Sequence, residues 1–220
     1  MLLIGDVHGL FYDYRELLKQ HKPKYSLQLG DMGVGFPQSN ELILNDIPGD
    51  HKWIRGNHDN PSVARAHPNY VGDYGILKGS FINGLYDKLF YIGGAWSIDW
   101  QHRTEGISIW HDEQLSQKEL SDAVNLYNEE KPEVVCSHDC PTFILNYLHP
   151  GRVIPTRTSQ AMDVMFLSHK PSVWVFAHHH MSWRKRIDGC TFICLNELES
   201  CDISKRITKN PQEETYECID

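Results

Sequence analysis

The sequence predicts an α/β domain, because short apolar runs alternate with helical patterns over most of its 220 residues. Three observations support this fold class. Five apolar runs have the length of strands and are rich in Leu, Ile and Val, several segments between them have helical spacing, and each run is followed by a polar cluster. A chain of this length is sufficient for a single hydrophobic core.

The expected elements follow in order along the chain. Buried strands are predicted at residues 2–5, 25–30, 52–56, 133–137 and 172–177. Helices are predicted over residues 11–21, 116–130 and 158–169, and each of them ends shortly before a proline. The second helix opens with Ser116-Gln117-Lys118-Glu119, in which Ser and Glu have the spacing of a capping box.

Two further segments are predicted to add antiparallel strands. Residues 74–97 contain short apolar runs separated by glycines, and residues 183–187 and 190–195 flank Asp188-Gly189, a typical two-residue hairpin turn. The chain from 201 to 220 is polar and has no clear period. We therefore expect one domain over residues 1–200 and a polar C-terminal extension over residues 201–220.

Composition excludes several function classes. The 21 Lys and Arg against 29 Asp and Glu give a net charge of −8, which argues against an extended nucleic-acid-binding face. The sequence has no apolar span of membrane length and no secretory signal pattern, so a soluble, cytoplasmic protein without a membrane partner is expected. The C-x-x-x-C pairs Cys136–Cys140 and Cys190–Cys194 lie on expected strands, where the two thiols are too far apart to bridge, which favours reduced cysteines.

Five polar clusters carry the candidate chemistry. They are Asp6-Val7-His8-Gly9, Gly30-Asp31, Gly56-Asn57-His58-Asp59, Ser137-His138-Asp139 and His178-His179-His180. Loops that leave the carboxyl ends of strands in an α/β sheet converge on one crevice, so we expect these side chains to meet.

The residue types in these clusters point to metal ions. Carboxylate, amide and imidazole ligands together suit borderline divalent cations better than calcium. The clusters offer too many ligands for one tetrahedral zinc ion, whereas two ions that share a bridging carboxylate would use them all. We expect two divalent metal ions, with manganese favoured and iron, zinc, nickel, cobalt and magnesium as alternatives.

In this order the five clusters resemble the motifs of the calcineurin-like metallophosphoesterases, which run D-x-H, G-D, G-N-H-[DE], H and G-H-x-H. The resemblance extends from Asp6 to His180. It implies a four-layer α/β/β/α sandwich of two mixed β-sheets flanked by helices, with residues 1–200 as the catalytic domain. It also implies phosphoester hydrolysis by a hydroxide that bridges the two metals.

The resemblance further implies a role for each motif residue. The first metal would be held by Asp6, His8 and His180, the second by Asn57, His138 and His178, and Asp31 would bridge the two. His58 would protonate or stabilise the departing oxygen, and Asp59 would orient His58. His179 is expected to point away from the ligands beside it. Asp139 is expected to hold a hydrogen bond close to His138.

Two departures from the family pattern bear on the substrate. Ala177 stands where the family usually has glycine, and we expect little consequence. Protein Ser/Thr phosphatases of this superfamily usually read G-D-x-V-D-R-G, but residues 30–36 here contain no arginine. This favours small phosphodiesters or nucleotides as substrates, with a phosphomonoesterase or phosphoprotein phosphatase as the alternative.

Arginines elsewhere are candidates for binding the substrate phosphate. Arg157 is predicted at a helix start, Arg55 precedes the third cluster, and Arg103 follows the segment that contains Trp96 and Trp100. Both tryptophans are expected to pack in the core rather than stack on a nucleobase. A non-catalytic binding scaffold is the rival from another class, and the complete ligand set argues against it.

Overall fold

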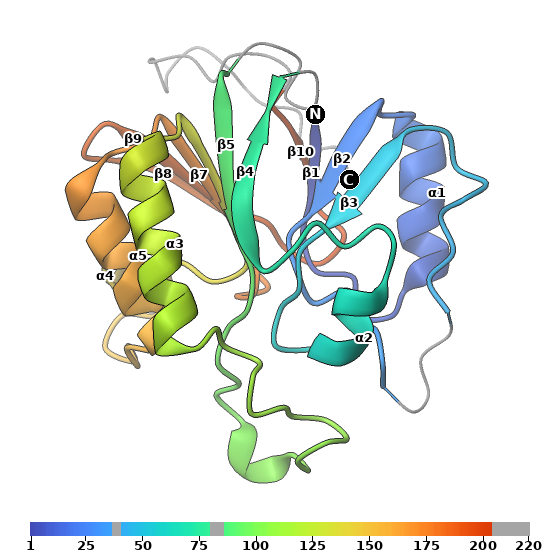
Figure 1. The fold of residues 1–220 in the computed structure, drawn as a ribbon, viewed down its shortest axis with the longest axis horizontal. Coiled ribbons are helices and arrows are strands. Elements are labelled where there is room, and N and C mark those ends of the chain that lie inside the picture. The colour runs from blue at the N-terminus through green and yellow to red at the C-terminus, as the bar shows by residue number, and fades with distance from the viewer. Residues whose placement is uncertain (37–40, 80–85, 204–220) are drawn as a thin grey trace.

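The computed structural model describes residues 1–36, 41–79 and 86–203, and these form the predicted α/β architecture. Two mixed β-sheets pack face to face, and helices cover the outer face of each sheet (Figure 1). The four-layer α/β/β/α sandwich is confirmed.

The first sheet has four strands in the order β10, β1, β2, β3. Strands β1 (Leu2–Ile4), β2 (Tyr25–Gln28) and β3 (Asp50–Trp53) are parallel, and β10 (Ser200–Asp202) pairs antiparallel with β1. Helix α1 (Phe11–His21) lies against the outer face of this sheet, and the short helix α2 (Pro61–Ala66) follows β3 (Figure 1).

The second sheet has six strands in the order β4, β5, β6, β7, β9, β8. Its parallel centre consists of β5 (Lys88–Ile92), β6 (Val134–Ser137), β7 (Val173–Phe176) and β9 (Cys190–Cys194). The edge strands β4 (Tyr74–Lys78) and β8 (Trp183–Ile187) are antiparallel to their neighbours, as the sequence predicts. Helices α3 (Gln117–Glu130), α4 (Thr142–Leu148) and α5 (Arg157–Ser168) cover the outer face (Figure 1).

Alternating side chains on the strands divide the core into three layers. On β1, Leu3 packs between the two sheets, whereas Leu2 and Ile4 pack toward α1. On β6, Val134 packs between the sheets, whereas Val135 packs against the helices of the other side. Both faces of these strands are therefore buried, which explains why they read as continuous apolar runs.

Local signals set the ends of several elements where the sequence predicts them. The Ser116 side chain accepts from the Glu119 backbone N–H at the start of α3, and the reciprocal bond completes the capping box. Asp188 and Gly189 both have positive φ, of 50° and 87°, as a two-residue hairpin turn between β8 and β9 requires.

Other boundaries differ from the prediction. Strand β3 ends at Trp53, so the segment from 54 to 56 belongs to the following loop. Helices α2 and α4, a 3₁₀ turn η2 (Trp100–His102) and strand β10 are additional elements. Strand β10 runs past residue 200, where the polar extension was expected to begin, and residues 204–220 of that extension lie outside the described part of the chain.

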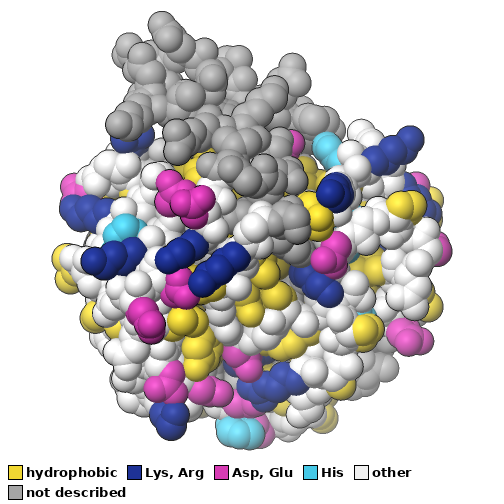
Figure 2. Space-filling view, turned by 45° about the horizontal axis from the view of Figure 1, so that its top comes forward, with side chains coloured by type: hydrophobic (Ala, Val, Ile, Leu, Met, Phe, Trp, Pro, Cys, Tyr) yellow, Lys and Arg dark blue, Asp and Glu magenta, His cyan; other side chains and the backbone are white. Residues whose placement is uncertain are grey.

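The described cysteines, one face of the surface and the helices can be compared with the expectations from composition. Four cysteines that the structure describes, Cys136, Cys140, Cys190 and Cys194, are buried and form no disulfide. Figure 2 shows basic and acidic side chains interspersed on one face of the molecule, without a continuous basic field. Within the described residues, none of the helices combines the length and the apolar character that a membrane span needs.

Candidate metal centre

The structure brings together, at one site, the polar loops that follow several strands. Loops after β1, β2 and β3 of the first sheet meet loops after β6 and β7 of the second. All seven candidate ligands lie in this site: Asp6, His8, Asp31, Asn57, His138, His178 and His180. The convergence expected at the carboxyl ends of strands is therefore observed, across two sheets rather than one.

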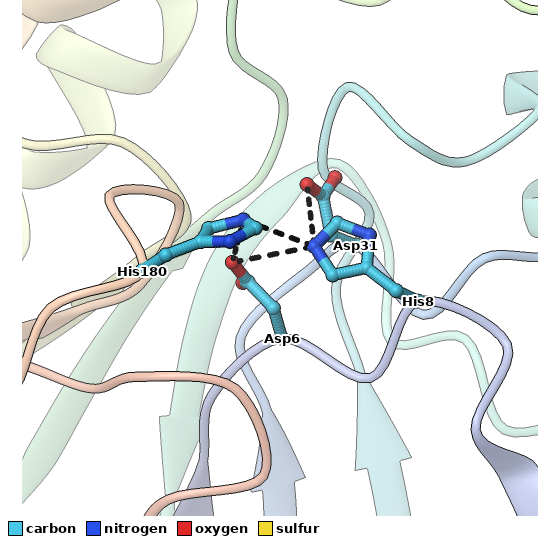
Figure 3. A group of neighbouring side chains, drawn as sticks. All are labelled: Asp6, His8, Asp31 and His180. Atoms are coloured by element: carbon cyan, nitrogen blue, oxygen red, sulfur yellow. Dashed lines mark hydrogen bonds and ion pairs between the residues drawn. The ribbon is translucent and has the colours of Figure 1, made fainter.

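One group consists of Asp6, His8, Asp31 and His180, whose candidate ligand atoms all lie within 4.8 Å of one another. His8 Nε2 lies 3.0 Å from His180 Nε2, and His180 Nε2 lies 3.3 Å from Asp6 Oδ2. Figure 3 shows both imidazoles and both carboxylates pointing toward a common centre. This arrangement can hold a cation with mixed oxygen and nitrogen ligands.

A second group shares Asp31 with the first. Asp31, His138 and His178 also place ligand atoms within 4.8 Å of one another. His138 Nε2 lies 3.2 Å from Asp31 Oδ1 and 3.2 Å from the amide oxygen of Asn57. Asp31 is thus the residue between the two groups, where a bridging ligand would stand.

The unsatisfied atoms of the site test whether cations fit. Asp6 Oδ2 and Asp31 Oδ2 are buried and have no hydrogen-bond partner among the described residues. A buried carboxylate oxygen without a partner is costly unless a cation or a donor compensates it. Because imidazole nitrogens face these oxygens, the donor set fits divalent metal ions.

The buried carboxylates and imidazoles of the site shift one another's pKa values. Burial raises the pKa of Asp6 well above its usual range. Burial alone would lower the pKa of His138, but the carboxylates of Asp31 and Asp6 and the Leu29 carbonyl together outweigh burial and raise this pKa to about 9. Burial would likewise raise the pKa of Asp31, but His138 and the other imidazoles hold it below its usual range. The site therefore stabilises positive charge beside its carboxylates.

Two glycines leave room for this packing. A Cβ atom on Gly56 would collide with the Asp31 carboxylate and the His138 ring, and a Cβ atom on Gly30 would also collide with that ring. Gly30 in addition has a φ of 99°. Ala177, which stands in place of the family's glycine, is buried between the sheets without a positive φ.

His58 lies beside the first group and contacts Arg103. The His58 ring centroid is 4.9 Å from that of His8, and the His58 backbone N–H donates to Asp31 Oδ1. Arg103 Nη2 lies 2.6 Å from His58 Nε2, while Arg103 Nε donates to Asp99 Oδ1. Burial lowers the pKa of His58 to about 4, and the positive charge of Arg103 adds to this effect. Because a guanidinium carries only donors, Arg103 donates to His58 Nε2.

Asp59 differs from its expected role of orienting His58. Its carboxylate accepts backbone N–H bonds from Gly56 and from three consecutive residues, Met32, Gly33 and Val34. Asp59 is fully buried, and this burial raises its pKa to about 6. The side chain thus ties the loop after β3 to the loop after β2, and the group that contacts the His58 ring nitrogen is Arg103.

A buried chain of hydrogen bonds fixes the amide of Asn57. Asn57 Nδ2 donates to Ser97 Oγ at 3.1 Å, and Ser97 Oγ donates in turn to Glu113 Oε2 at 2.8 Å. Glu113 Oε1 also accepts from the Ser97 backbone N–H. Because the amide nitrogen of Asn57 is committed to Ser97, its oxygen faces His138 and the second group.

The three candidate arginines have different surroundings. Arg55 is fully buried, and its guanidinium donates to Asp73 and to the Glu113 carbonyl, so the prediction that it contacts substrate is wrong. Arg157 is exposed at the start of α5 and donates to the Gln114 carbonyl. Of the three candidates, Arg103 is the arginine whose side chain contacts a site residue, His58.

Three contributors were not predicted. Glu197 lies 3.2 Å from His180 Nδ1 and follows β9, while Ser97 follows β5 and Glu113 lies in the loop before α3. Glu197 and Ser97 come after the carboxyl ends of parallel strands, so the rule that identified the ligands could also have found them.

Comparison with known proteins gives one family. A family model described as calcineurin-like phosphoesterase matches residues 1–182. A search of the curated proteins finds no significant match.

Solved structures match this chain at low sequence identity. A chain provisionally assigned as a 5′-nucleotidase from Staphylococcus aureus, in complex with alpha-ketoglutarate, is 14% identical with a TM-score of 0.51, and the match covers 90% of this chain and 49% of that one. An archaeal phosphodiesterase is 11% identical with a TM-score of 0.42, over 92% of this chain and 94% of that one. The chain thus spans about half the length of the first of these proteins.

Proposed function

Since the chain belongs to the calcineurin-like phosphoesterase family, we propose that it hydrolyses phosphoester bonds with two divalent metal ions. The observation that carries the proposal is the pair of ligand groups that share Asp31 and contain two unpartnered carboxylate oxygens. A scaffold has no need to keep such costly buried groups together.

The ligands divide between the two ions around Asp31. We assign Asp6, His8 and His180 to the first ion and Asn57, His138 and His178 to the second, with Asp31 shared. Metal ions in such a pair polarise the phosphoryl group and supply a nucleophile at neutral pH. Manganese is the favoured metal. Iron, zinc, nickel and cobalt suit the same mixed donor set, and magnesium, the remaining alternative, suits its oxygen ligands.

The chain's own residues position the ester and its departing oxygen. Hydrolysis adds water across the P–O bond, so the departing oxygen must gain a proton or a hydrogen bond. His58 lies beside the first group and is the residue that protonates or hydrogen-bonds this oxygen. Arg103 carries the guanidinium that binds phosphoryl oxygens, and Asp99 holds that guanidinium in place.

The substrate class follows from the arginines near the metals. Residues 30–36 contain no phosphate-binding arginine, and Arg55 is buried in an ion pair. Of the three candidate arginines, Arg103 is therefore the one that contacts the site. A single arginine suits the lower charge of a diester better than a doubly charged phosphomonoester. We infer small phosphodiesters or nucleotides as substrates, and phosphomonoesters, including phosphoproteins, as the alternative. The four buried cysteines without a disulfide, Cys136, Cys140, Cys190 and Cys194, support a cytoplasmic location.

The test compares p-nitrophenyl phosphate with bis(p-nitrophenyl) phosphate after loading with Mn²⁺ and, separately, with the other metals. We expect metal-dependent hydrolysis, faster on the bis ester, and strong loss of activity in Asp31→Asn and His58→Ala. Full activity of His58→Ala on an ester with a poor leaving group would contradict the role of His58. A protein that binds the metals but hydrolyses neither ester would be a scaffold.

A further inference from the structure

Besides the two ligand groups of the metal centre, a third group of polar side chains lies on the helix-covered side of the six-stranded sheet. It consists of Asp139 and Cys140, which follow β6, and His179, which follows β7. Cys140 is fully buried among the residues that pack under α4 and α5, and Asp139 is 3% exposed. His179 turns its ring toward this cluster, away from the centre shared by the ligands on either side of it.

Two distances from His179 match those between atoms that share one tetrahedral ion. His179 Nε2 lies 3.5 Å from Cys140 Sγ and 3.5 Å from Asp139 Oδ1. Ligands at zinc–sulfur and zinc–nitrogen bond lengths stand about 3.5 Å apart at the tetrahedral angle. The three ligand atoms also lie within 4.8 Å of one another.

Neighbouring groups contact and orient the side chains that would bind the metal. His149 Nε2 lies 3.4 Å from His179 Nδ1, so a proton on Nδ1 leaves Nε2 free to bind a metal. The Cys140 backbone N–H donates to Asp139 Oδ1 at 2.7 Å, and Thr156 Oγ1 lies 3.5 Å from Asp139 Oδ2. Three protein ligands leave a fourth position for water.

We propose that Asp139, Cys140 and His179 form a third metal site, distinct from the two-metal centre, that binds a thiolate-preferring ion such as Zn²⁺ or Co²⁺. A thiolate selects such ions over Mn²⁺ and Mg²⁺, so this site differs from the main centre in metal as well as in place. Metal binding displaces the thiol proton of Cys140 to solvent and forms a metal–sulfur bond.

The position of the site gives it a structural role. Asp139 directly follows His138, and His179 directly follows His178, so one ion would link the two loops that carry ligands of the second group. This role rests on the proposed function, whereas the binding of the ion does not.

Cobalt spectroscopy tests the site on the full-length protein. Thiolate–Co²⁺ coordination gives a near-ultraviolet charge-transfer band, and the seven ligands of the two-metal centre contain no sulfur. With excess Co²⁺, which also fills the two-metal centre, we expect the intensity of the band to correspond to one thiolate-bound Co²⁺ per chain. The band should disappear in Cys140→Ala and fall sharply in His179→Asn. Cys190→Ala, which removes a buried thiol from the same core layer, should keep the full band.

The outcomes separate this proposal from the proposed function. A folded wild-type protein without the band, or a band that persists in Cys140→Ala, would overturn the third site, and Asp139, Cys140 and His179 would then be a hydrogen-bonded cluster only. Phosphoesterase activity without the band leaves the proposed function standing. The band without phosphoesterase activity overturns the proposed function alone.

Discussion

Arg103 Nη2 lies 2.6 Å from His58 Nε2, so the long loop between β5 and α3 contacts the loop after β3 at the edge of the metal centre. Asp99 Oδ1, four residues earlier on the same loop, holds Arg103 Nε at 2.6 Å. The guanidinium is thereby placed before any substrate arrives, which reduces the ordering cost of phosphate binding.

Removal of this guanidinium should weaken phosphate binding. We expect Arg103→Ala to lower kcat/KM for the bis ester by roughly 10²-fold, the loss typical of one charge-stabilising donor. Arg103→Lys should recover only part of it, because an ammonium group cannot contact Asp99 and a phosphoryl oxygen through a planar fork. Steady-state kinetics measure kcat/KM of both variants, with Arg152→Ala at an exposed arginine as the control. An unchanged kcat/KM in Arg103→Ala would show that Arg103 does not bind the substrate.

Ser97 should control metal affinity without touching a metal. Ser97→Ala removes the acceptor that fixes the Asn57 amide, so the amide can rotate and present nitrogen to the second group. Losses of 10–100-fold in metal affinity are typical for groups that orient a ligand. Competition between the protein and a chelator for Mn²⁺ measures the affinity, with Ser168→Ala on α5 as the control. Equal affinities of wild type and Ser97→Ala would show that the amide is held by other contacts.

Asp59 should stabilise the fold more than it serves catalysis. Its two oxygens accept four backbone N–H bonds, and an asparagine in its place offers one oxygen and an NH₂ group that faces donors. We expect Asp59→Asn to lower the free energy of unfolding by about 2 kcal/mol or more. Urea unfolding of the metal-free protein measures this, and Asp13→Asn on the exposed face of α1 should change it by less than about 0.5 kcal/mol. A midpoint like that of wild type would contradict the role.

His51 should make stability depend on pH. It is buried in β3, where its Nδ1 lies 2.9 Å from Ser26 Oγ and its Nε2 lies 3.1 Å from the Pro48 carbonyl. Burial lowers its pKa in the folded protein, so the unfolded chain binds the proton more readily. The contribution of His51 is therefore complete above the unfolded pKa of about 6.5 and is lost as pH falls through the folded pKa.

Urea unfolding at pH 7.5 and pH 5 checks this dependence. The loss of stability on acidification should be smaller in His51→Gln than in wild type, whereas the exposed His111→Gln should keep the wild-type loss. If His51→Gln loses as much stability as wild type, other groups carry the acid sensitivity.

Much of this fold could be predicted because its signals are local. Helix α1 matches its predicted range, since Leu18 and its neighbours have helical spacing and the helix ends at Lys22 in a left-handed conformation before Pro23. The candidate ligands could be identified because each follows a strand, and strand ends converge by topology. Helix α4 is only seven residues long and starts after Pro141 without a side-chain cap, so no local signal identifies it.

The remaining features depend on contacts between residues that are far apart in the sequence, and a local motif does not specify such contacts. The partner of His58 is Arg103, 45 residues away on an irregular loop, and the partner of Arg55 is Asp73. Asp59 resembles a catalytic partner because it follows His58, yet its contacts go to backbone groups of another loop. Such pairings are set by the packing of the two sheets, which only the folded structure shows.

Four of the candidate ligands have left-handed backbone conformations, with φ of 49° at His8, 52° at Asp31, 68° at His178 and 50° at His180. Non-glycine residues adopt this region at a cost of roughly 1–2 kcal/mol each, and the cost is somewhat less for Asp and His. Replacement of any of them by glycine would relieve this strain and destroy a ligand at the same step. The metal centre is therefore a region where selection for stability and selection for chemistry oppose each other, and sequences optimised for stability alone would be expected to lose it first.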